Sequence, residues 1–477
     1  MSRALRTVSF YMVALAIVLT STNLSHAQKF DFTRLDQKVR DVSVILDIKF
    51  EVSFGIHSTE QQERYLGTVV SEDGLVIFNG SAFESENAAA MFSGFSMKTT
   101  PTRIEVTTLD GTTYTGEYVG VDRYTRLGFV RITDLGDDRL KAISFDSGAK
   151  LTVGNWLALY VLLPEHVEPP LAADVGMVSA LLTRPEPFVL TTGFNSLQLA
   201  AVLFDENLKP VGLLSGLFDS GGSIDGMGDG FGAFGMPLLG MISAERLAKM
   251  IADPPRMGEA DRGWLGITLQ ALTPDIAEFW GLTVPGGIII NEVVRNSPAE
   301  EAGLKVGDVI IAVNGQPVRV DREENLSVFQ RQISEMGSDV PVEFTILRNV
   351  GNEFETRRLL ATLGKAPLAA TEAPEYKVES LDFKIRDLVF ADYMRFNKDP
   401  ESLSGVIVSE IKQGGLGSIG GLRFGDVIQR IGSTGVSNLE EARAAIETMV
   451  QQQPSEVIFF VWRNNRTMFV NVKPDWD

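Results

Sequence analysis

The stretch A-G-L-K-V-G-D-V-I at residues 302–310 returns in similar form as G-G-L-R-F-G-D-V-I at residues 420–428. Each copy follows a β-prone run and precedes a helix-prone stretch and a closing strand. These flanking stretches are 286–290, 326–336 and 342–347 for the first copy, and 404–408, 439–449 and 456–462 for the second. Such a repeat indicates two copies of one small α+β unit. The segment at 367–374 is rich in Pro, Ala and Glu, which predicts a linker between them.

An A-G-L-x-x-G-D-x-I motif after a strand resembles the signature of PDZ domains. The repeat therefore predicts one PDZ domain over residues 256–366 and a second over residues 375–477. The glycines of the motif allow tight turns, and Asp308 and Asp426 are expected to cap those turns.

Peptide binding is expected at the loop and strand that border the groove of each PDZ domain. There an extended peptide adds as a strand, and loop amides hold its terminal carboxylate. In the first domain these residues are Gly263, Trp264, Leu265, Gly266, Ile267 and Leu269. In the second domain Asp382 stands where a glycine is expected, which places a negative charge beside the carboxylate site. The second domain therefore either binds C-termini poorly or serves only as a packing domain.

The N-terminal half, from about residue 40 to 215, shows short β-prone runs separated by turn signals. Asp73-Gly74 and Asp110-Gly111 each stand between two such runs, which is a hairpin signal. Strands at this spacing predict an all-β barrel or sandwich. A glycine-rich loop at 221–235 follows, and then a helix at 243–252, which prolines stop.

The first residues read as an export signal. Arg3 and Arg6 precede an apolar run at 10–19, and Ala27 closes a small-residue end, so we predict a signal peptide over 1–27 with cleavage near Ala27. The apolar run is too short for a stable membrane span, although an uncleaved anchor is the alternative. We therefore expect a periplasmic or secreted protein.

Composition narrows the function further. The chain has no cysteine, three histidines and a formal net charge of −19. The charge argues against nucleic acid as a partner. Without cysteine there is no thiol nucleophile or disulfide, and the scattered histidines suggest no metal site. No cofactor is expected.

An exported all-β domain followed by two PDZ domains resembles the HtrA/Deg family of trypsin-like serine proteases, over almost the whole mature chain. The matching stretches are 67–74, 103–132, 175–181 and 220–224. The resemblance implies a mainly β fold, with a trypsin-like double β-barrel over residues 28–253, and assembly as a homotrimer. It also implies a Ser-His-Asp triad.

The motif positions of that triad carry other residues. The histidine position falls on Ser81 and the aspartate position on Arg126. Two alignments are open for the nucleophile position. Counting back from Val211 places Gln198 there, whereas matching the Asn-Ser dipeptide of the motif to Asn195-Ser196 places Ser196 there. A hydroxyl cannot serve as a base near neutral pH, and a guanidinium repels an imidazolium.

Other serines and histidines lie off these positions. Ser220 falls in a D-S-G-G string, but after the strand that should follow the nucleophile, and His57 and His166 lie away from the histidine position. We therefore predict no enzyme. The expected function is an exported pseudoprotease that binds extended segments or free C-termini of polypeptides, as a scaffold, adaptor or chaperone-like factor. Active HtrA/Deg relatives are further candidate partners. The alternatives are an active serine endopeptidase with relocated catalytic residues, or a purely structural oligomeric module.

Overall fold

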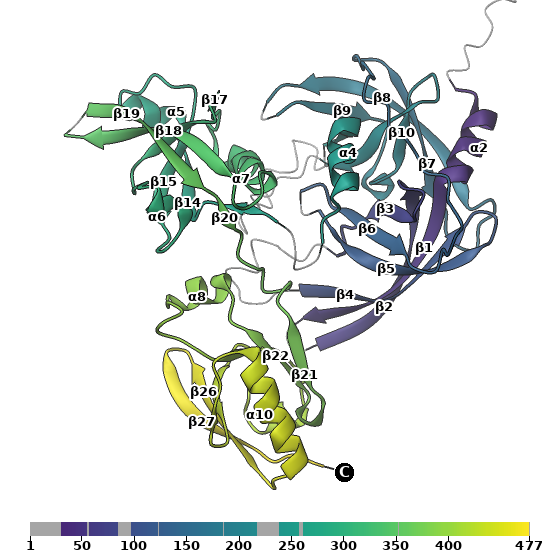
Figure 1. Cartoon of the computed structure of the whole chain (residues 1–477). Helices are drawn as coiled ribbons and strands as arrows, with labels where there is room; N and C mark the ends of the chain where they lie inside the picture. Colours follow the sequence, from purple (N-terminus) through teal and green to yellow (C-terminus); the bar gives the residue numbers. More distant parts are fainter. Residues whose placement is uncertain are drawn as a thin grey trace, which may run out of the picture.

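The computed structural model describes residues 30–54, 57–83, 97–122, 124–184, 186–216, 238–256, 261–351 and 353–476. Figure 1 shows a double barrel formed by the N-terminal half and two smaller units formed by the C-terminal half. Among the described residues, no helix is long and apolar enough to cross a membrane.

The first barrel is closed, with strand order β1-β2-β3-β6-β5-β4. The helix α2 (Phe32–Val42) precedes it, and its strands are β1 (Ser43–Phe54), β2 (His57–Val69), β3 (Leu75–Asn79), β4 (Met97–Thr108), β5 (Thr113–Val121) and β6 (Leu127–Ile132). Closure leaves no free sheet edge. Aromatic rings fill the interior, where Phe78 makes edge contacts with Tyr65 and Phe83 at 5.3 and 5.7 Å between centroids.

The second barrel is also closed, with order β10-β11-β12-β9-β8-β7. Its elements are β7 (Trp156–Leu162), β8 (Leu171–Leu182), β9 (Phe188–Thr192), the 3-10 turn η1 (Ser196–Gln198), β10 (Val202–Phe204), β11 (Pro210–Gly216), β12 (Leu239–Ser243) and α4 (Ala244–Ala252). The Ser243 hydroxyl caps α4 by accepting from the amide of Arg246, so the helix lies where the sequence predicted it. One shared core joins the barrels, because Leu75 and Leu127 of the first cluster with Ala158 and Phe204 of the second.

The first C-terminal unit is a sheet of order β14-β15-β16-β18-β19, with short strands beside it. Its elements are β13 (Gly263–Trp264), β14 (Ile267–Ala271), α5 (Pro274–Phe279), β15 (Ile288–Val293), α6 (Pro298–Glu301), β16 (Val309–Val313), β17 (Gln316–Pro317), η2 (Glu323–Asn325), α7 (Leu326–Glu335), β18 (Pro341–Val350), β19 (Glu353–Thr362) and β20 (Gly364–Lys365). The helix α7 covers the core through Phe329 and Ile333.

The second unit repeats this plan with order β21-β22-β23-β24-β26-β27. Its elements are β21 (Glu375–Val378), η3 (Glu379–Leu381), β22 (Phe383–Asp387), α8 (Phe390–Phe396), β23 (Val406–Ile411), α9 (Leu416–Ile419), β24 (Val427–Ile431), β25 (Thr434–Gly435), α10 (Leu439–Gln452), β26 (Val457–Arg463) and β27 (Arg466–Val472). The expected fold class, a trypsin-like double β-barrel followed by two PDZ-like units, is confirmed.

The repeated motif has the same structure in both units. The carboxylate of Asp308 accepts from the amide of Lys305 at 2.8 Å, and that of Asp426 accepts from the amide of Arg423 at 2.9 Å. Both aspartates thus cap the turn before the following strand, as the sequence predicted.

Candidate catalytic and peptide-binding sites

Ser81 and Arg126 are brought together at the end of the β3–β6 pair. Asn79 is the register partner of Leu127, and the amide of Gly80 donates to the carbonyl of Arg126 at 2.9 Å. The Ser81 hydroxyl donates to the side-chain oxygen of Asn79 at 2.7 Å. The two positions are therefore neighbours in space although the chain separates them.

Arg126 lies in a tight turn between β5 and β6. Its backbone is left-handed, with φ of 58°, and its amide donates to the carbonyl of Asp122 at 2.7 Å. The carboxylate of Asp122 accepts from both the amide and the hydroxyl of Thr125, each at 2.7 Å. Asp122 therefore fixes the turn that presents Arg126.

Gln198 is buried in the 3-10 turn η1 of the second barrel. Its side-chain oxygen accepts from the amide of Asn195 at 2.8 Å, and its side-chain nitrogen donates to the carboxylate of Asp174 at 2.5 Å. Ser196, two residues earlier, is exposed. The loop between β9 and β10 is thus held by Gln198, and Ser196 stands on its outer side.

The two histidines of the described chain lie in different elements. His57 is the first residue of β2, and His166 lies in the loop that joins β7 to β8. Ser220 and the glycine-rich loop 221–235 lie outside the described residues. Within the described ranges, no group of three or more His, Cys, Asp or Glu residues is placed to hold a metal ion.

The strand β14 and the helix α7, which would form the walls of the peptide groove, lie next to each other in the first PDZ-like unit. Leu265 is buried in the core of the unit, and Ile267 and Leu269 pack against that core. Gly266 has φ of +80°, and a Cβ added there would stand 2.3 Å from the Cβ of Ser297. Only glycine fits this position, because a side chain meets both the left-handed backbone and a neighbouring atom.

Backbone hydrogen bonds fix the loop that precedes β14. The carbonyl of Leu265 accepts from the amide of Ala299, and the carbonyl of Gly266 accepts from the amide of Val294, each at 2.9 Å. The Trp264 ring meets Phe390 of α8 in the second unit edge-on, at 5.8 Å between centroids. The six residues expected at this site lie on one continuous segment, and the structure adds a contact between Trp264 and the neighbouring unit.

Asp382 takes the place of Gly266 in the second unit. Its carbonyl accepts from the amide of Lys412 at 2.9 Å, which repeats the bond between Gly266 and Val294, and its φ is 58°. Its carboxylate forms an ion pair with the Lys412 ammonium at 3.3 Å. The negative charge expected at this loop is therefore present, with a cation beside it.

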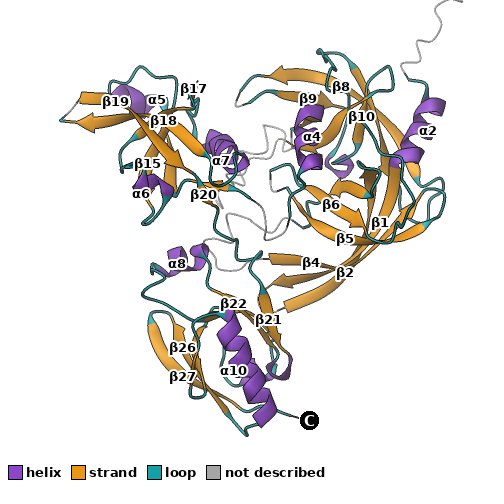
Figure 2. Ribbon diagram, viewed as in Figure 1, coloured by secondary structure: helices purple, strands orange, loops and turns teal. Residues whose placement is uncertain are grey.

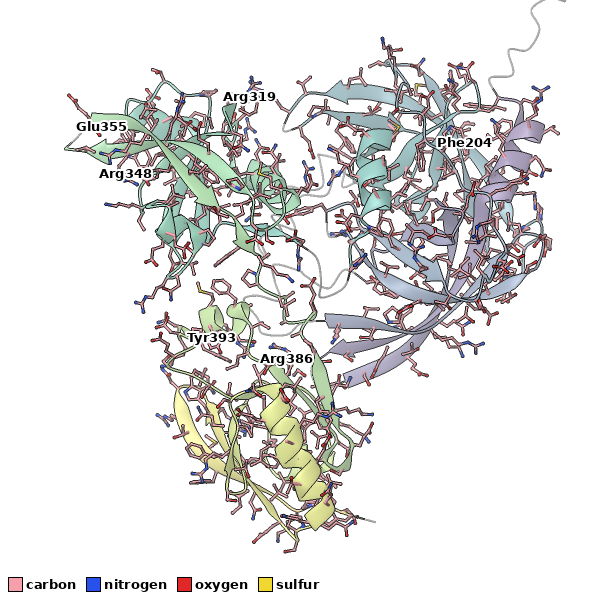
Figure 3. All side chains as sticks on the ribbon, viewed as in Figure 1. Phe204, Arg319, Arg348, Glu355, Arg386 and Tyr393 are labelled. Atoms are coloured by element: carbon pink, nitrogen blue, oxygen red, sulfur yellow. The ribbon has the colours of Figure 1, made fainter. Side chains whose placement is uncertain are left out.

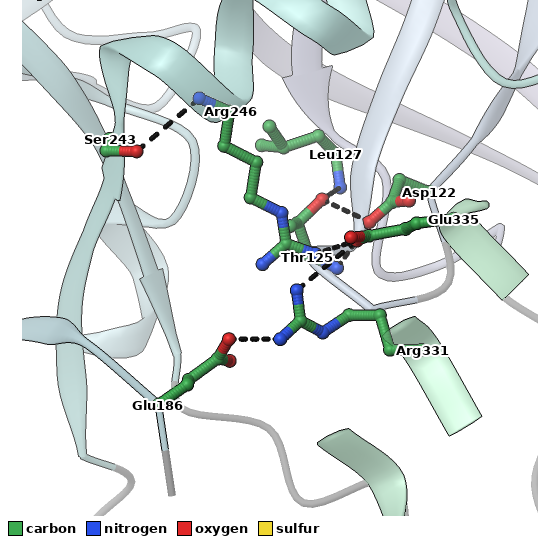
Figure 4. A network of polar contacts seen from close by, with 8 residues as sticks. All are labelled: Asp122, Thr125, Leu127, Glu186, Ser243, Arg246, Arg331 and Glu335. Carbon is green, nitrogen blue, oxygen red and sulfur yellow. Dashed lines mark hydrogen bonds and ion pairs between the residues drawn. The ribbon is translucent and has the colours of Figure 1, made fainter. Parts of the chain in front are cut away.

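Charged residues connect α7 to the second barrel (Figure 4). Arg331 of α7 pairs with Glu186, in the loop between β8 and β9, and with Glu335 one helical turn away at 3.3 Å. Glu335 also pairs with Arg246 of α4 at 2.9 Å. A cavity of about 1720 Å³, lined by parts of both barrels and by α7, lies beside these residues. The sequence offered only one sign of this network, the i, i+4 spacing of Arg331 and Glu335.

Comparison with known proteins shows what the chain is similar to. The PDZ domain family matches residues 256–346 and 393–457. A protein of Chlamydia pneumoniae named "Probable periplasmic serine endoprotease DegP-like" is 25% identical over 439 residues, which cover 89% of this chain and 80% of that protein. A protein of the same name from Halomonas elongata is 25% identical over 432 residues, covering 87% of this chain and 80% of its own length. The chain is a relative of the HtrA/DegP-type serine proteases with PDZ domains.

Solved structures of the HtrA type are similar as well. The HtrA-type protease AlgW with a decapeptide is 20% identical, covers 71% of this chain and 100% of its own, and has a TM-score of 0.48. The serine endoprotease from Yersinia pestis is 18% identical, covers 70% of this chain and 98% of its own, and has a TM-score of 0.45.

The prediction of a pseudoprotease without enzymatic activity is contradicted by these relatives. They match along most of their length, and their names describe serine endoproteases. The prediction rested on the residues at three motif positions, Ser81, Arg126 and Gln198 or Ser196, and it set aside Ser220 by its place in the sequence. The names of the relatives overturn the conclusion that the chain is no enzyme.

Proposed function

We propose that this chain is an exported serine endopeptidase of the HtrA/DegP type, and that its first PDZ domain captures polypeptides by extended segments or free C-termini. The observation that supports the endopeptidase is the match over 439 residues to a protein named as a serine endoprotease. The observation that supports capture is the loop 263–267, in which Gly266 can be only glycine. An open edge at β14 would accept a peptide as an added strand.

The domains follow the proposed boundaries: a signal peptide over 1–27, a double barrel over 28–253, PDZ domains over 256–366 and 375–477, and a linker over 367–374. The signal peptide would be removed near Ala27, and the mature protein would work in the periplasm. Assembly as a homotrimer is part of the proposal and rests on the family resemblance.

The motif positions for histidine and aspartate fall on Ser81 and Arg126, and the position for serine falls on Gln198 or on Ser196. The side chain of Gln198 is bonded to Asn195 and Asp174 and cannot attack a carbonyl. The serine would therefore be Ser196, which is exposed on the same loop, or Ser220, which follows β11 in the chain.

Cleavage of unfolded casein by the purified mature chain tests this proposal. We expect slow cleavage that Ser196→Ala or Ser220→Ala abolishes, since removal of the nucleophile of a triad lowers turnover by about a millionfold. Ser81→Ala is the matched control and should leave the rate unchanged, because the proposal gives Ser81 no chemical role. Absence of cleavage, or equal cleavage by all four proteins, would refute the endopeptidase.

A further inference from the structure

The groove strand of the second PDZ domain already has a strand on each side. β22 pairs with β23 on one edge, and β21 covers the other edge with the register Glu375↔Arg386, Tyr376↔Ile385, Lys377↔Lys384 and Val378↔Phe383. Figure 2 shows β21 and β22 running side by side beneath α10. A peptide that binds by adding a strand needs the edge that β21 occupies.

The first PDZ domain is different at the same place. There β13, which precedes the groove loop as β21 does in the second domain, pairs with β20 through Gly263↔Lys365 and Trp264↔Gly364. Among the described residues, β14 has only β15 as its strand partner, so its outer edge is not taken by another strand. The difference is one of strand pairing, because the loops of both domains share the same backbone hydrogen bond.

The strand β21 has the direction and the side-chain pattern of a bound peptide. It runs antiparallel to β22, and its last residue, Val378, stands opposite Phe383 next to the loop that contains Asp382. Val378 is 1% exposed and belongs to the domain core. Tyr376 packs against that core, and the guanidinium of Arg443 on α10 lies 5.5 Å from its ring centroid. Lys377 between them is exposed, so alternate side chains fill the groove.

Charge pairs hold β21 and β22 against the first barrel. The Lys98 ammonium of β4 lies 2.8 Å from the carboxylate of Glu375, and both side chains are about four-fifths buried, at 22% and 18% exposure. Lys384 of β22 lies 2.8 Å from Glu410 and 3.9 Å from Glu51 of β1. Departure of β21 from the groove would therefore also break its contact with the barrel.

We propose that Tyr376-Lys377-Val378 is an internal ligand of the second PDZ domain. The groove then accepts a partner's C-terminal segment, with a small apolar last residue and an aromatic residue two places before it, only after β21 has left. This inference does not depend on the endopeptidase, because it concerns which segment occupies a groove. A groove that is closed most of the time lowers the apparent affinity for a partner by the fraction of open molecules.

Fluorescence anisotropy with a labelled peptide tests the proposal. The probe is T-E-A-P-E-Y-K-V, the sequence of residues 371–378, with a free C-terminal carboxylate. Hydrogen exchange of the amides at 383–387, followed with and without the probe, separates binding at the second domain from binding at the first. The full mature chain is used throughout.

Lys377→Pro is the releasing variant, because proline removes an amide and disfavours a strand interior while the lost side chain is an exposed one. We expect the probe to bind this variant at least about tenfold more tightly than the native chain, and to protect residues 383–387. Lys377→Ala keeps the strand and should behave as the native chain does.

Charge reversal gives a second route that leaves the domain core intact. Lys98→Glu should tighten binding of the probe severalfold, and Lys98→Glu combined with Glu375→Lys should restore the native affinity. The proposal is overturned if the native chain binds the probe as tightly as Lys377→Pro does. It is equally overturned if neither Lys377→Pro nor Lys98→Glu, each folded by circular dichroism, gives probe-dependent protection at residues 383–387.

Discussion

The guanidinium of Arg348, which is labelled in Figure 3, donates to the buried carboxylate of Asp308 through Nε at 2.7 Å and through Nη2 at 2.6 Å. Arg463 and Asp426 repeat this bidentate pair in the second PDZ domain, at 2.5 and 2.6 Å. In each domain the arginine also donates to a carbonyl of the glycine turn, at Gly303 and Gly421. The hydrogen bonds that Arg348 donates to Asp308 raise the pKa of Arg348, despite the opposing effect of burial, so the guanidinium stays charged. The aspartate of each G-D motif thus links two parts of its domain. In the first domain it joins β18 to the turn before β16, and in the second it joins β26 to the turn before β24.

We expect Asp308→Asn to destabilise the first PDZ domain by about 3–5 kcal/mol, because it leaves a partly buried cation without its counter-charge. Urea unfolding of the mature chain, followed by the tryptophan fluorescence of that domain, measures the loss. Arg357→Gln is the control, since it removes a more exposed pair with Glu355, at 2.8 Å, and should cost under about 1 kcal/mol. Equal losses from the two substitutions would contradict the assigned role of Asp308.

The turn at Asp73-Gly74 predicts that the unfolding free energy of the chain depends on pH. The hydrogen bond from the Ser71 hydroxyl, together with the charge of Arg131, holds the pKa of Asp73 below its usual value. A carboxyl whose folded pKa lies below its unfolded value stabilises the fold above the unfolded pKa, and this contribution disappears as pH falls through the folded pKa. The unfolding free energy of the native chain should therefore exceed that of Asp73→Asn at pH 7. The difference should shrink as pH falls below the usual aspartate pKa of about 3.9, and it should disappear once pH is below the folded pKa.

At pH 7 we expect the unfolding free energies of the native chain and Asp73→Asn to differ by less than about 1 kcal/mol. The Asp73 side chain is largely exposed, and solvent screens its pair with Arg131. Ser71→Ala removes the hydroxyl donor and should reduce the same difference. Urea titrations between pH 2 and 7 supply the measurement. A difference that persists unchanged at low pH would show that Asp73 acts through packing and not through its charge.

The ion pairs between α7 and the second barrel predict that a charge reversal at Arg331 changes the overall shape of the molecule. Arg331→Glu places a third carboxylate beside Glu186 and Glu335, and like charges repel. We expect the first PDZ domain to detach from the barrel, which raises the radius of gyration measured by small-angle scattering. Glu186→Arg added to Arg331→Glu should reverse the increase. Arg319→Glu changes an exposed arginine of the same domain (Figure 3) and should leave the shape unchanged.

The sequence predicted those features that local chemistry determines. The D-G turns, the helix α4 with the prolines after it and the aspartate caps of the repeated motif all depend on residues within a few positions of one another, and the structure has them. The position of β21 was not predictable in this way, because β21 and β13 precede similar loops and yet pair with different strands. The sequence pointed to Asp382 as the obstacle to peptide binding. The structure pairs Asp382 with Lys412 and shows β21 across the groove strand, so the obstacle at the second domain is a strand.

Two glycines of the first PDZ domain allow a controlled test of peptide capture. Gly266 and Gly303 both have left-handed backbones, with φ of +80° and +77°. A Cβ at Gly266 would stand 2.3 Å from the Cβ of Ser297, whereas a Cβ at Gly303 would meet nothing within 4 Å. The two alanine variants therefore share the same backbone strain and differ in whether the groove loop must move.

We expect Gly266→Ala to weaken binding of a peptide with a free C-terminal carboxylate by at least about tenfold, because displaced loop amides no longer point at the carboxylate. Gly303→Ala should cost about 1 kcal/mol of stability and leave the affinity unchanged. Calorimetric titration of both variants, with the amidated peptide as a further comparison, measures these effects. Loss of affinity in both variants alike would mean that the loop at 263–267 is not the carboxylate site, and that capture must occur on another surface of the domain.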